Sequence, residues 1–247
     1  MLLAVDIGNT NINLGLFKGE RIIKRFIIPT KTKGYKSRLQ KIINRYKATD
    51  AIVCSVVPTA GRIIEKDLKG LMARQPYIIG KGIKVPIKNR YRKPGQVGQD
   101  RLVNAYAGVS LYGAPLIMVD FGTAVTFDVI SGRKEYLGGM IIPGLGISLE
   151  ALNERTALLP KIKLEEPREF LGRDTKNSML SGIVYGFAAL TDDLVTRIRQ
   201  KIGKGAKAIG TGGNIGLIAK YCRKLDRIDK DLTLKGLSLI YRFQKNS

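Results

Sequence analysis

Residues 2–29 read "LLAVDIGNTNINLGLFKGERIIKRFIIP", and residues 116–143 read "LIMVDFGTAVTFDVISGRKEYLGGMIIP". The two stretches align without a gap, and seven of the 28 aligned positions are identical, among them Asp6 with Asp120 and Gly8 with Gly122. The shared order of elements is the stronger sign of an internal repeat. Each copy predicts a buried strand, a turn of small residues, an alternating strand, and a hairpin into a third strand.

The apolar alternation in the second strand predicts a difference between the two turns. The alternating residues are Ile12, Leu14 and Leu16 in the first copy, and Val125, Phe127 and Val129 in the second. In the gapless alignment these two sets are out of phase by one residue. Because side chains alternate between the faces of a strand, we expect the first turn to be one residue longer than the second.

After each set of three strands the pattern becomes α/β. Helices are predicted at residues 37–46, 59–75, 96–112, 177–202, 214–221 and 230–243, with strands at "AIVCSVV", "PYIIG" and "AKAIGTGG". The fold class is therefore α/β, with two similar lobes of β-β-β-α-β-α and a nucleotide cleft between them. We place the N-terminal lobe and its linking helix at residues 1–113 and the C-terminal lobe at residues 114–247.

Composition excludes several classes of function. The 247 residues include no histidine, which excludes serine–histidine triads and histidine-ligated metal sites. Cys54 and Cys222 are isolated, so no disulfide framework or zinc site is indicated. No apolar run approaches the roughly 20 residues of a membrane span, and "MLLAV" is too short for a signal peptide. We expect a soluble, cytoplasmic protein that binds no membrane.

The formal charge of +23 and the pI of about 10.1 would attract polyanions. However, the basic residues are spread along the chain and few aromatic residues lie among them, which weakens a base-stacking interpretation. A solvated basic surface is favoured over a dedicated nucleic-acid site. The basic stretches are Lys31 to Lys41, Lys81 to Lys93, Lys201 to Lys207 and Lys220 to Arg227.

The first turn offers groups that suit a phosphate and a metal ion. Gly8 allows close approach of the backbone, and the side chains that follow can donate to phosphate oxygens. Asp6 suits Mg²⁺, although it could simply cap a turn. A second carboxylate–glycine turn at residues 120–123 favours function. The "GTGGN" at residues 210–214 is either a nucleotide-contacting loop or a tight strand-to-helix turn, and no P-loop motif is present.

The strand-end turns resemble the phosphate loops of the acetate and sugar kinase, Hsp70 and actin superfamily, whose lobes are ribonuclease-H-like. Within it, the chain is most similar to type III pantothenate kinase. The resemblance runs in order from residue 1 to about residue 240. It rests on "VDIGNTN", "NRYRKPGQVGQDRLVNAYAG", "VDFGTAVTFD", "GGMIIPGLGISLEAL", "GRDTKNSMLSGIVYG" and "GTGGN".

This resemblance implies that ATP phosphorylates pantothenate to 4'-phosphopantothenate, the first step of coenzyme A biosynthesis, with Mg²⁺ as cofactor. It implies Asp100 as the general base, Asp120 as ligand of a monovalent cation (K⁺ or NH₄⁺), and a homodimer. The implied ATP-binding residues are Asp6, Ile7, Gly8, Asn9, Thr10, Asn11, Ile12, Asn13 and Thr123. The implied pantothenate-binding residues are Tyr91, Gly98, Gln99, Asp100, Arg101 and Thr175. The chain departs mildly from common family forms in "GRDT" and at Gln99.

The residues around Asp100 fit that chemistry. Pro94 and Gly95 precede a predicted helix that carries Asp100 and Arg101 near its start. Arg101 would offer a planar fork to a substrate carboxylate, and the helix N-terminus would keep Asp100 ionised, as a base requires. Without the resemblance, Asp100 could equally be a first-turn charge and Arg101 a surface residue.

Two alternatives stay open at this point. One is a kinase of a sugar or of another small acid, which a carboxylate-binding Arg101 disfavours when the acceptor is neutral. The other is a regulatory nucleic-acid-binding protein that keeps the kinase fold, which only the +23 charge favours. We expect no specific nucleic-acid binding.

Overall fold

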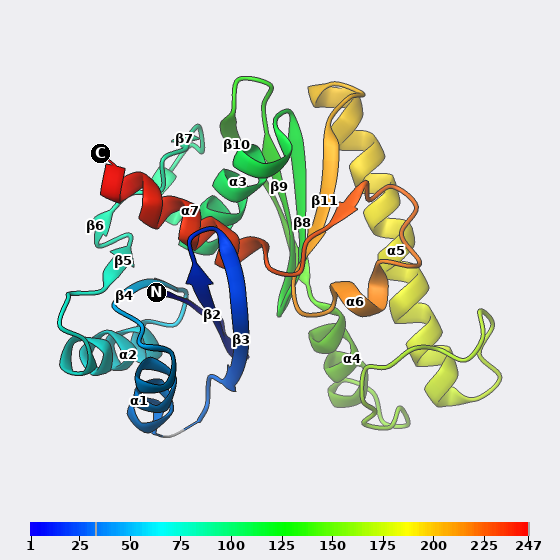
Figure 1. Cartoon of the computed structure of the whole chain (residues 1–247). Coiled ribbons are helices and arrows are strands. Elements are labelled where there is room, and N and C mark those ends of the chain that lie inside the picture. Colours follow the sequence, from blue (N-terminus) through cyan, green and yellow to red (C-terminus); the bar gives the residue numbers. More distant parts are fainter. Residues whose placement is uncertain (33, 247) are drawn as a thin grey trace. The chain divides into compact units, whose positions relative to one another are not determined.

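The computed structural model describes residues 1–32 and 34–246, and the chain divides into two compact units (Figure 1). Unit 1 comprises Met1–Leu111 and Asp231–Ser247, and unit 2 comprises Tyr112–Lys230. The sequence expectation assigned residues 231–247 to the C-terminal half, whereas in the structure they belong to unit 1. The reason is an apolar helix face, described below, that packs on unit 1.

Unit 1 is built on a sheet of strand order β3-β2-β1-β4-β5-β6, in which β1 is antiparallel to β2 and parallel to β4. Helices α1 and α2 pack with the sheet around one buried cluster that includes Leu14, Leu39 and Ile64. The elements are β1 (Leu2–Ile7), β2 (Asn11–Lys18), β3 (Arg21–Pro29), α1 (Tyr35–Tyr46), β4 (Asp50–Ser55), α2 (Pro58–Leu71), β5 (Tyr77–Ile79), β6 (Gly82–Ile83), β7 (Lys88–Asn89), η1 (Pro94–Gln96), α3 (Gln99–Tyr112) and α7 (Leu232–Asn246).

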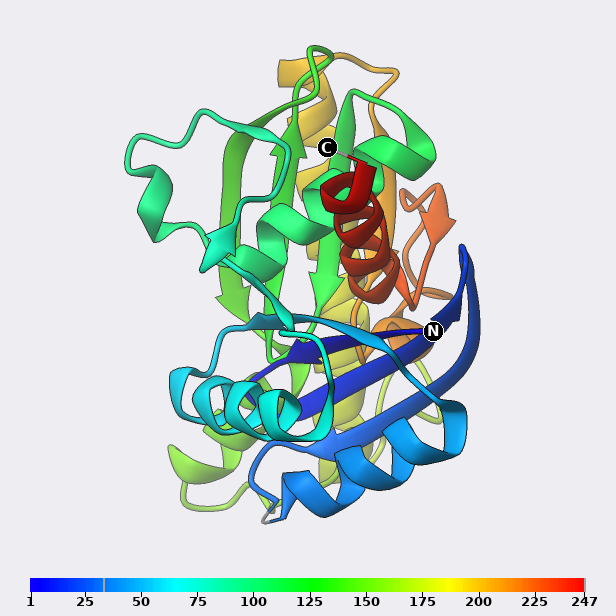
Figure 2. The ribbon, with the colours of Figure 1, turned by 60° about the vertical axis from the view of Figure 1, so that its left-hand side comes forward.

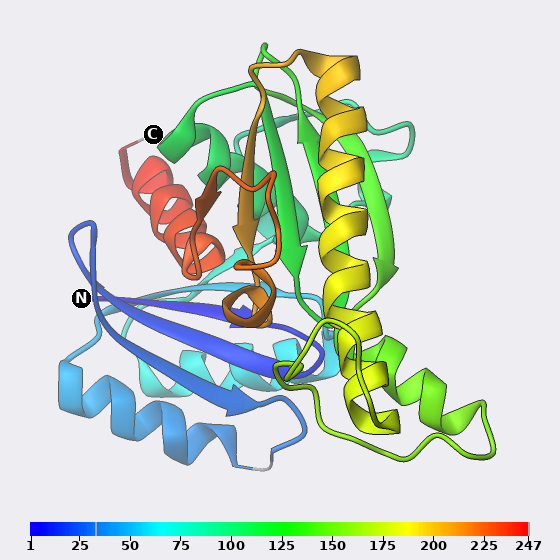
Figure 3. The ribbon, with the colours of Figure 1, turned by 90° about the vertical axis from the view of Figure 1, so that its right-hand side faces the viewer.

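Unit 2 repeats the plan with the strand order β12-β11-β8-β9-β10, in which β8 is antiparallel to β9 and parallel to β11. The long helix α5 runs along this sheet (Figure 3) and buries Val184, Ala188 and Val195 against it. The elements are β8 (Leu116–Phe121), β9 (Ala124–Ile130), β10 (Glu135–Pro143), α4 (Leu145–Glu154), α5 (Thr175–Ile202), β11 (Lys207–Thr211), α6 (Ile215–Ile218) and β12 (Arg227–Ile228).

The repeat predicted from the sequence is confirmed, together with the difference between its turns. Three residues separate β1 from β2, and two separate β8 from β9. The registers place Ile7 opposite Ile12 and Phe121 opposite Val125, as the phase difference requires. Helix α4 was not predicted, and residues 214–221 were predicted to be helical where α6 forms only a single turn.

Helix α7 closes unit 1 because it packs on β1, β2 and β4 (Figure 2). It buries Leu232, Leu237 and Ile240, which recur at helical spacing. At Gly236 the helix approaches α3 so closely that a Cβ atom would lie 2.8 Å from the carbonyl oxygen of Val103.

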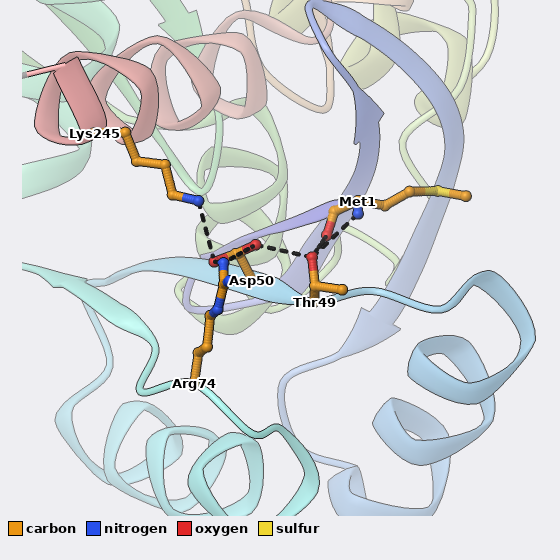
Figure 4. Close-up of polar contacts among 5 residues, drawn as sticks. All are labelled: Met1, Thr49, Asp50, Arg74 and Lys245. Carbon is orange, nitrogen blue, oxygen red and sulfur yellow. Dashed lines mark hydrogen bonds and ion pairs between the residues drawn. The ribbon is translucent and has the colours of Figure 1, made fainter.

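A buried carboxylate at the start of β4 ties the end of α7 to the sheet (Figure 4). Asp50 accepts a hydrogen bond from Thr49 at 2.8 Å and pairs with Arg74 at 3.0 Å and with Lys245 at 3.6 Å. Burial raises the pKa of Asp50, but the hydrogen bonds from Thr49 and Arg74 and the nearby cations outweigh it, so the net pKa is lowered.

Within the described part of the chain, no helix combines the length and the apolar character that a membrane crossing requires.

Candidate active site

The first carboxylate turn of unit 1 joins β1 to β2 and is held by backbone contacts. The Gly8 N–H donates to the Asn11 carbonyl at 3.0 Å, and the Thr30 hydroxyl donates to the Gly8 carbonyl at 2.6 Å. The Thr30 N–H donates to the Thr10 carbonyl at 2.9 Å. Asn9, Thr10 and Asn11 are exposed. The turn therefore presents polar side chains from a fixed backbone.

Two of the predicted ATP-binding residues have side chains that point into the protein core and away from solvent. The side chains of Ile7 and Ile12 lie in the core of unit 1, with 0% and 1% of their surface exposed. Since they flank the turn, a contact of either residue with ATP would have to come from its backbone. The apolar alternation of the strands already indicated this burial.

Asp6 lies near the end of β1 and is closely surrounded by protein atoms, although it keeps partial exposure. Burial raises its pKa to about 7, a hydrogen bond from Asn13 opposes the rise, and the charge of Asp100 adds to it. The Asn13 amide donates to Asp6 at 3.2 Å, so this partner is neutral rather than cationic. A bound cation would therefore relieve an uncompensated carboxylate here.

Asp100 stands in the first turn of α3, where its carboxylate accepts the backbone N–H of Arg101 at 2.9 Å. Burial raises the pKa of Asp100, while that backbone hydrogen bond and the charge of Arg101 lower it. The expectation that the helix N-terminus sets the charge state is thus only part of the account, because desolvation is the larger effect. A Cβ atom at Gly98 would lie 2.5 Å from Asp100 Oδ1, so any side chain there would displace this carboxylate.

Arg101 is only 8% exposed, which excludes the alternative that it is a surface residue. Gln99, the first residue of α3, lies against Gly80, where a Cβ atom would be 3.2 Å from its Cγ. Tyr91 is half-buried, and its backbone N–H donates to the Asn89 side chain at 2.9 Å. These residues are all in unit 1, and their contacts with a substrate stay predictions.

Unit 1 brings the two carboxylates of interest together at one end of its parallel strands. Asp6 is paired in register with Cys54 across β1 and β4. Burial raises the pKa of the Cys54 thiol, and the charges of Asp6 and Asp100 add to the shift. The carboxyl ends of β1 and β4 and the start of α3 therefore form one acidic corner of this unit.

In unit 2 the second carboxylate turn, residues 120–123, is packed against the "GTGGN" loop at residues 210–214. Gly122 donates to the Ala124 carbonyl at 3.1 Å, and Asn214 donates its N–H to the Phe121 carbonyl at 3.0 Å. Gly212 has a φ of +96°, and a Cβ atom there would lie 2.4 Å from Asp120 Oδ1. The "GTGGN" loop is therefore built onto the Asp120 turn, as a nucleotide loop would require. Thr123 is exposed.

Thr175 begins α5 and is exposed. Asp174 is the N-cap, and it accepts the Asn177 N–H at 2.8 Å, so the long helix begins two residues before the predicted start at residue 177. Thr175 lies in unit 2, and its contact with the acceptor stays a prediction.

The carboxylates of Asp6 and Asp120 suit cations that take few of their ligands from the protein. Among the described residues, no group of three or more His, Cys, Asp or Glu side chains could hold a metal ion. Asp6 and Asp120 each end a strand of their own unit. Mg²⁺ typically takes one or two carboxylates and completes its shell with water and phosphate oxygens, which this pattern suits.

Thr30 and Gly144 are structural residues of the two turns that sequence reasoning missed. Gly144 donates its backbone N–H to the Thr123 carbonyl at 3.1 Å, in the way that Thr30 donates to Thr10. A signal was present, because each residue directly follows the Ile-Ile-Pro that closes its copy of the repeat.

Two repeated α/β units with a carboxylate turn at matching strand ends place the chain in the fold class of sugar kinases and actin. The solved structure of the ROK hexokinase from Thermus thermophilus matches with a TM-score of 0.52 and 15% identity, covering 100% of this chain and 99% of that one. The ADP-bound MreB5 of Spiroplasma citri matches with a TM-score of 0.55 and 11% identity, covering 99% and 98%.

The sequence comparisons narrow this class to one family. A sequence model of the type III pantothenate kinase family matches residues 2–197. The type III pantothenate kinase of Moorella thermoacetica is 40% identical over 250 residues, which cover 98% of each chain. The chain belongs to the type III pantothenate kinase family.

Proposed function

We propose that the chain transfers the γ-phosphoryl group of ATP to the terminal hydroxyl of pantothenate, giving 4'-phosphopantothenate and ADP in the first step of coenzyme A biosynthesis. Family membership supports this reaction. The structural observation that carries it is the placement of the partly buried Asp100 beside the buried Arg101 at the start of α3, since the acceptor has both a hydroxyl and a carboxylate.

On the acceptor side, Asp100 takes the hydroxyl proton as the acceptor oxygen attacks the γ-phosphorus. The new P–O bond forms as the bond between the γ-phosphorus and the bridging oxygen breaks, and ADP leaves with that electron pair. Arg101 binds the substrate carboxylate as a planar fork, with Tyr91, Gly98 and Gln99 beside it. Because phosphoryl transfer depends mainly on positioning, the placement of Asp100 matters more than its strength as a base.

On the nucleotide side, the turn from Asp6 to Asn13 and Thr123 bind ATP, chiefly through backbone N–H groups and the exposed polar side chains. Asp6 holds Mg²⁺, which supplies neutralisation of charge on the phosphates when it is bound. Asp120 holds a monovalent cation, K⁺ or NH₄⁺. The raised pKa of Asp6 supports a cation site, because a nearby positive charge restores the ionised form.

We further propose a homodimer, but on a different surface from the one first considered. From the sequence, the broad apolar side of α5 with Ile183, Val184, Phe187 and Ala188 predicts a surface shared by the core and a partner. The structure buries Val184 and Ala188 in the core of unit 2 and packs Ile183 and Phe187 against it. The opposite side of α5 is exposed and small, with Gly182 and Gly186 facing open space. A partner helix could approach closely there, so Gly186→Gln should shift the mass measured by light scattering towards that of a monomer.

An acceptor panel tests the proposed reaction. Purified protein is given ATP, Mg²⁺ and K⁺ with pantothenate, with a neutral sugar, or with other small hydroxy acids, and ADP release is measured. We expect turnover with pantothenate only, and turnover with a sugar alone would overturn the assignment. Replacing K⁺ by tetramethylammonium should slow turnover, and an unchanged rate would reject the cation role of Asp120. The cytoplasmic location stays a prediction.

A further inference from the structure

One segment of unit 1 carries a large share of the positive charge and has no part in the proposed reaction. Residues 21–47 contain ten Lys or Arg residues and no Asp or Glu, against a net charge of +23 for the chain. This segment folds as β3, the connection after it, and α1. Seven of these ten basic residues lie on β3 and α1, which are side by side (Figure 3).

A groove runs between this strand and this helix, and its volume is about 620 Å³. From β3 it is lined by Phe26 and Ile28, which also pack against the core of unit 1, and by Ile27. From the helix side it is lined by Gly34, Ser37, Arg38, Lys41 and Ile42. It thus combines an apolar floor with a basic and hydroxyl-bearing rim, a combination suited to a ligand with both apolar and anionic groups.

The cations of the rim have no acidic partner in the described part of the chain. Arg38 and Lys41 are exposed and lie on a helix that has no acidic residue in its sequence. Elsewhere in unit 1 the basic side chains do find carboxylates, as Arg25 does with Asp231 and Lys69 with Glu65. An anion from outside unit 1 can therefore bind at the rim without displacing an ion pair.

The strand beside the groove is an edge of the sheet. β3 ends the strand order of unit 1, so its outer side has no ladder partner among the described residues. It is nine residues long, and Ile27 is 68% exposed on it. Such an edge can accept a further strand. A second copy of β3 is disfavoured, since Arg21 and Lys24 make the strand basic and two such strands would bring like charges together.

We propose that this groove, the β3–α1 groove, docks an extended acidic segment of another protein. The segment adds to the outer edge of β3 through backbone hydrogen bonds, a mode used by several peptide-binding domains. On the side of the sheet that faces α1, the carboxylates of the segment pair with Arg38 and Lys41, and on the other side its alternate apolar side chains lie beside the exposed Ile27. The open edge favours a peptide over nucleic acid, because the unpaired backbone N–H and C=O groups of β3 can extend a strand ladder with a peptide backbone.

The probe for this site is a fluorescein-labelled peptide of eight residues that alternates Glu and Val, titrated against the full chain at physiological salt. The test variant is Arg38→Glu/Lys41→Glu. The matched control is Arg62→Glu/Lys66→Glu, which makes the same change in net charge at exposed positions of α2, outside the groove. Pantothenate kinase activity of both variants is measured as a check on folding, since neither pair belongs to the proposed reaction site.

We expect saturable peptide binding that weakens at least about tenfold in the Arg38→Glu/Lys41→Glu variant, because removal of one charged hydrogen bond typically lowers affinity by a factor of about ten. The Arg62→Glu/Lys66→Glu variant should bind as the wild type does. A peptide N-methylated at alternate amides should also fail to bind, because it cannot complete the strand ladder.

Three results would overturn the proposal. The first is equal weakening in both double variants, which would indicate attraction by net charge alone. The second is unchanged binding of the N-methylated peptide, which would exclude strand addition. The third is a mixed-sequence DNA duplex that binds more tightly than the peptide and loses binding in the Arg38→Glu/Lys41→Glu variant, which would identify the segment as a nucleic-acid surface. Each result is independent of whether pantothenate is the kinase substrate.

Discussion

The backbone N–H of Gly144 donates to the carbonyl oxygen of Thr123 at 3.1 Å, and this contact fixes the second carboxylate turn from the far end of the neighbouring hairpin. The first turn has the same support, since Thr30 donates to Thr10 at 2.9 Å. In both units the residue that follows Ile-Ile-Pro holds the turn in place. The repeat therefore preserves the support of the turn as well as its carboxylate.

Gly144→Ala should disturb this support. A Cβ atom at position 144 would lie 2.2 Å from the Thr123 carbonyl oxygen, so the turn or the start of α4 must move. Overpacking of this kind typically costs about 1–3 kcal/mol of stability, and we also expect weaker ATP binding by calorimetry. The control is Gly146→Ala, where a Cβ atom meets nothing within 4 Å and the helix should gain stability. Equal behaviour of the two variants would contradict this account.

Asp100→Asn keeps the shape of the side chain and removes the base. We expect kcat with pantothenate to fall by about 10² to 10⁴, the usual cost of losing a general base. ATP affinity measured by calorimetry should change little, because the proposed ATP turns belong to other segments. Because burial raises the pKa of Asp100, the activity of the wild type should fall as the pH drops through that raised pKa. Near wild-type turnover in the variant would leave positioning as the source of catalysis.

Arg101→Ala should act on the acceptor rather than on the chemical step. Loss of a charged hydrogen bond to the substrate carboxylate should weaken pantothenate binding by about 1.5–3 kcal/mol, seen mainly in KM. Pantothenol, which lacks the carboxylate, supplies the control acceptor: the wild type and the variant should use it equally. A variant impaired to the same degree with both acceptors would reject the carboxylate contact.

Asp6→Asn should stabilise the nucleotide-free protein, and more so at high pH. The folded pKa of about 7 exceeds the ordinary value of 3.8, so between these values the folded state binds more protons and stability falls as pH rises. With partial exposure taken into account, we expect the variant to gain about 1–3 kcal/mol at pH 8, and much less at pH 5, in urea denaturation. Stabilisation by Mg²⁺–ATP should be lost. An equal gain in stability at both pH values would contradict the raised pKa of Asp6.

Asp50→Asn should have the opposite pH dependence. The folded pKa of Asp50 is lowered, so its stabilisation is present above the ordinary value of 3.8 and is lost as pH falls through the folded value. At pH 7 we expect a loss of about 1–2 kcal/mol, because the partner cations remain solvated. Asp67→Asn on α2 is the control and should change stability by less than about 0.5 kcal/mol. Urea denaturation at pH 7 and pH 3.5 distinguishes the two variants.

Much of the fold could be predicted because the repeat is encoded by short-range patterns of apolar and polar residues. Alternation in β2 and β9 indicated the strands, and the phase difference between them indicated the unequal turns. The turns at Asp6 and Asp120 could be predicted for the same reason. In each, an apolar strand is followed directly by a carboxylate and a glycine, and this motif is recognisable from neighbouring residues alone.

What depends on distant contacts could not be predicted. The burial of Arg101 and the raised pKa of Asp100 result from packing that no local pattern encodes. Helix α7 was predicted from its own periodicity, but its membership of unit 1 depends on the fit of Gly236 against Val103. The β3–α1 groove was hidden because Phe26 and Ile28 of β3 and Arg38 and Lys41 of α1 come together only after folding.

The return of α7 to unit 1 has a consequence for the order in which the protein can fold during synthesis. Unit 2 is one continuous stretch, whereas unit 1 is interrupted and lacks its last helix until residues 231–247 have left the ribosome. The unit that begins first is thus completed last. Until then the surface of β1, β2 and β4 that α7 covers stays open on the nascent chain, where it is a candidate for chaperone binding.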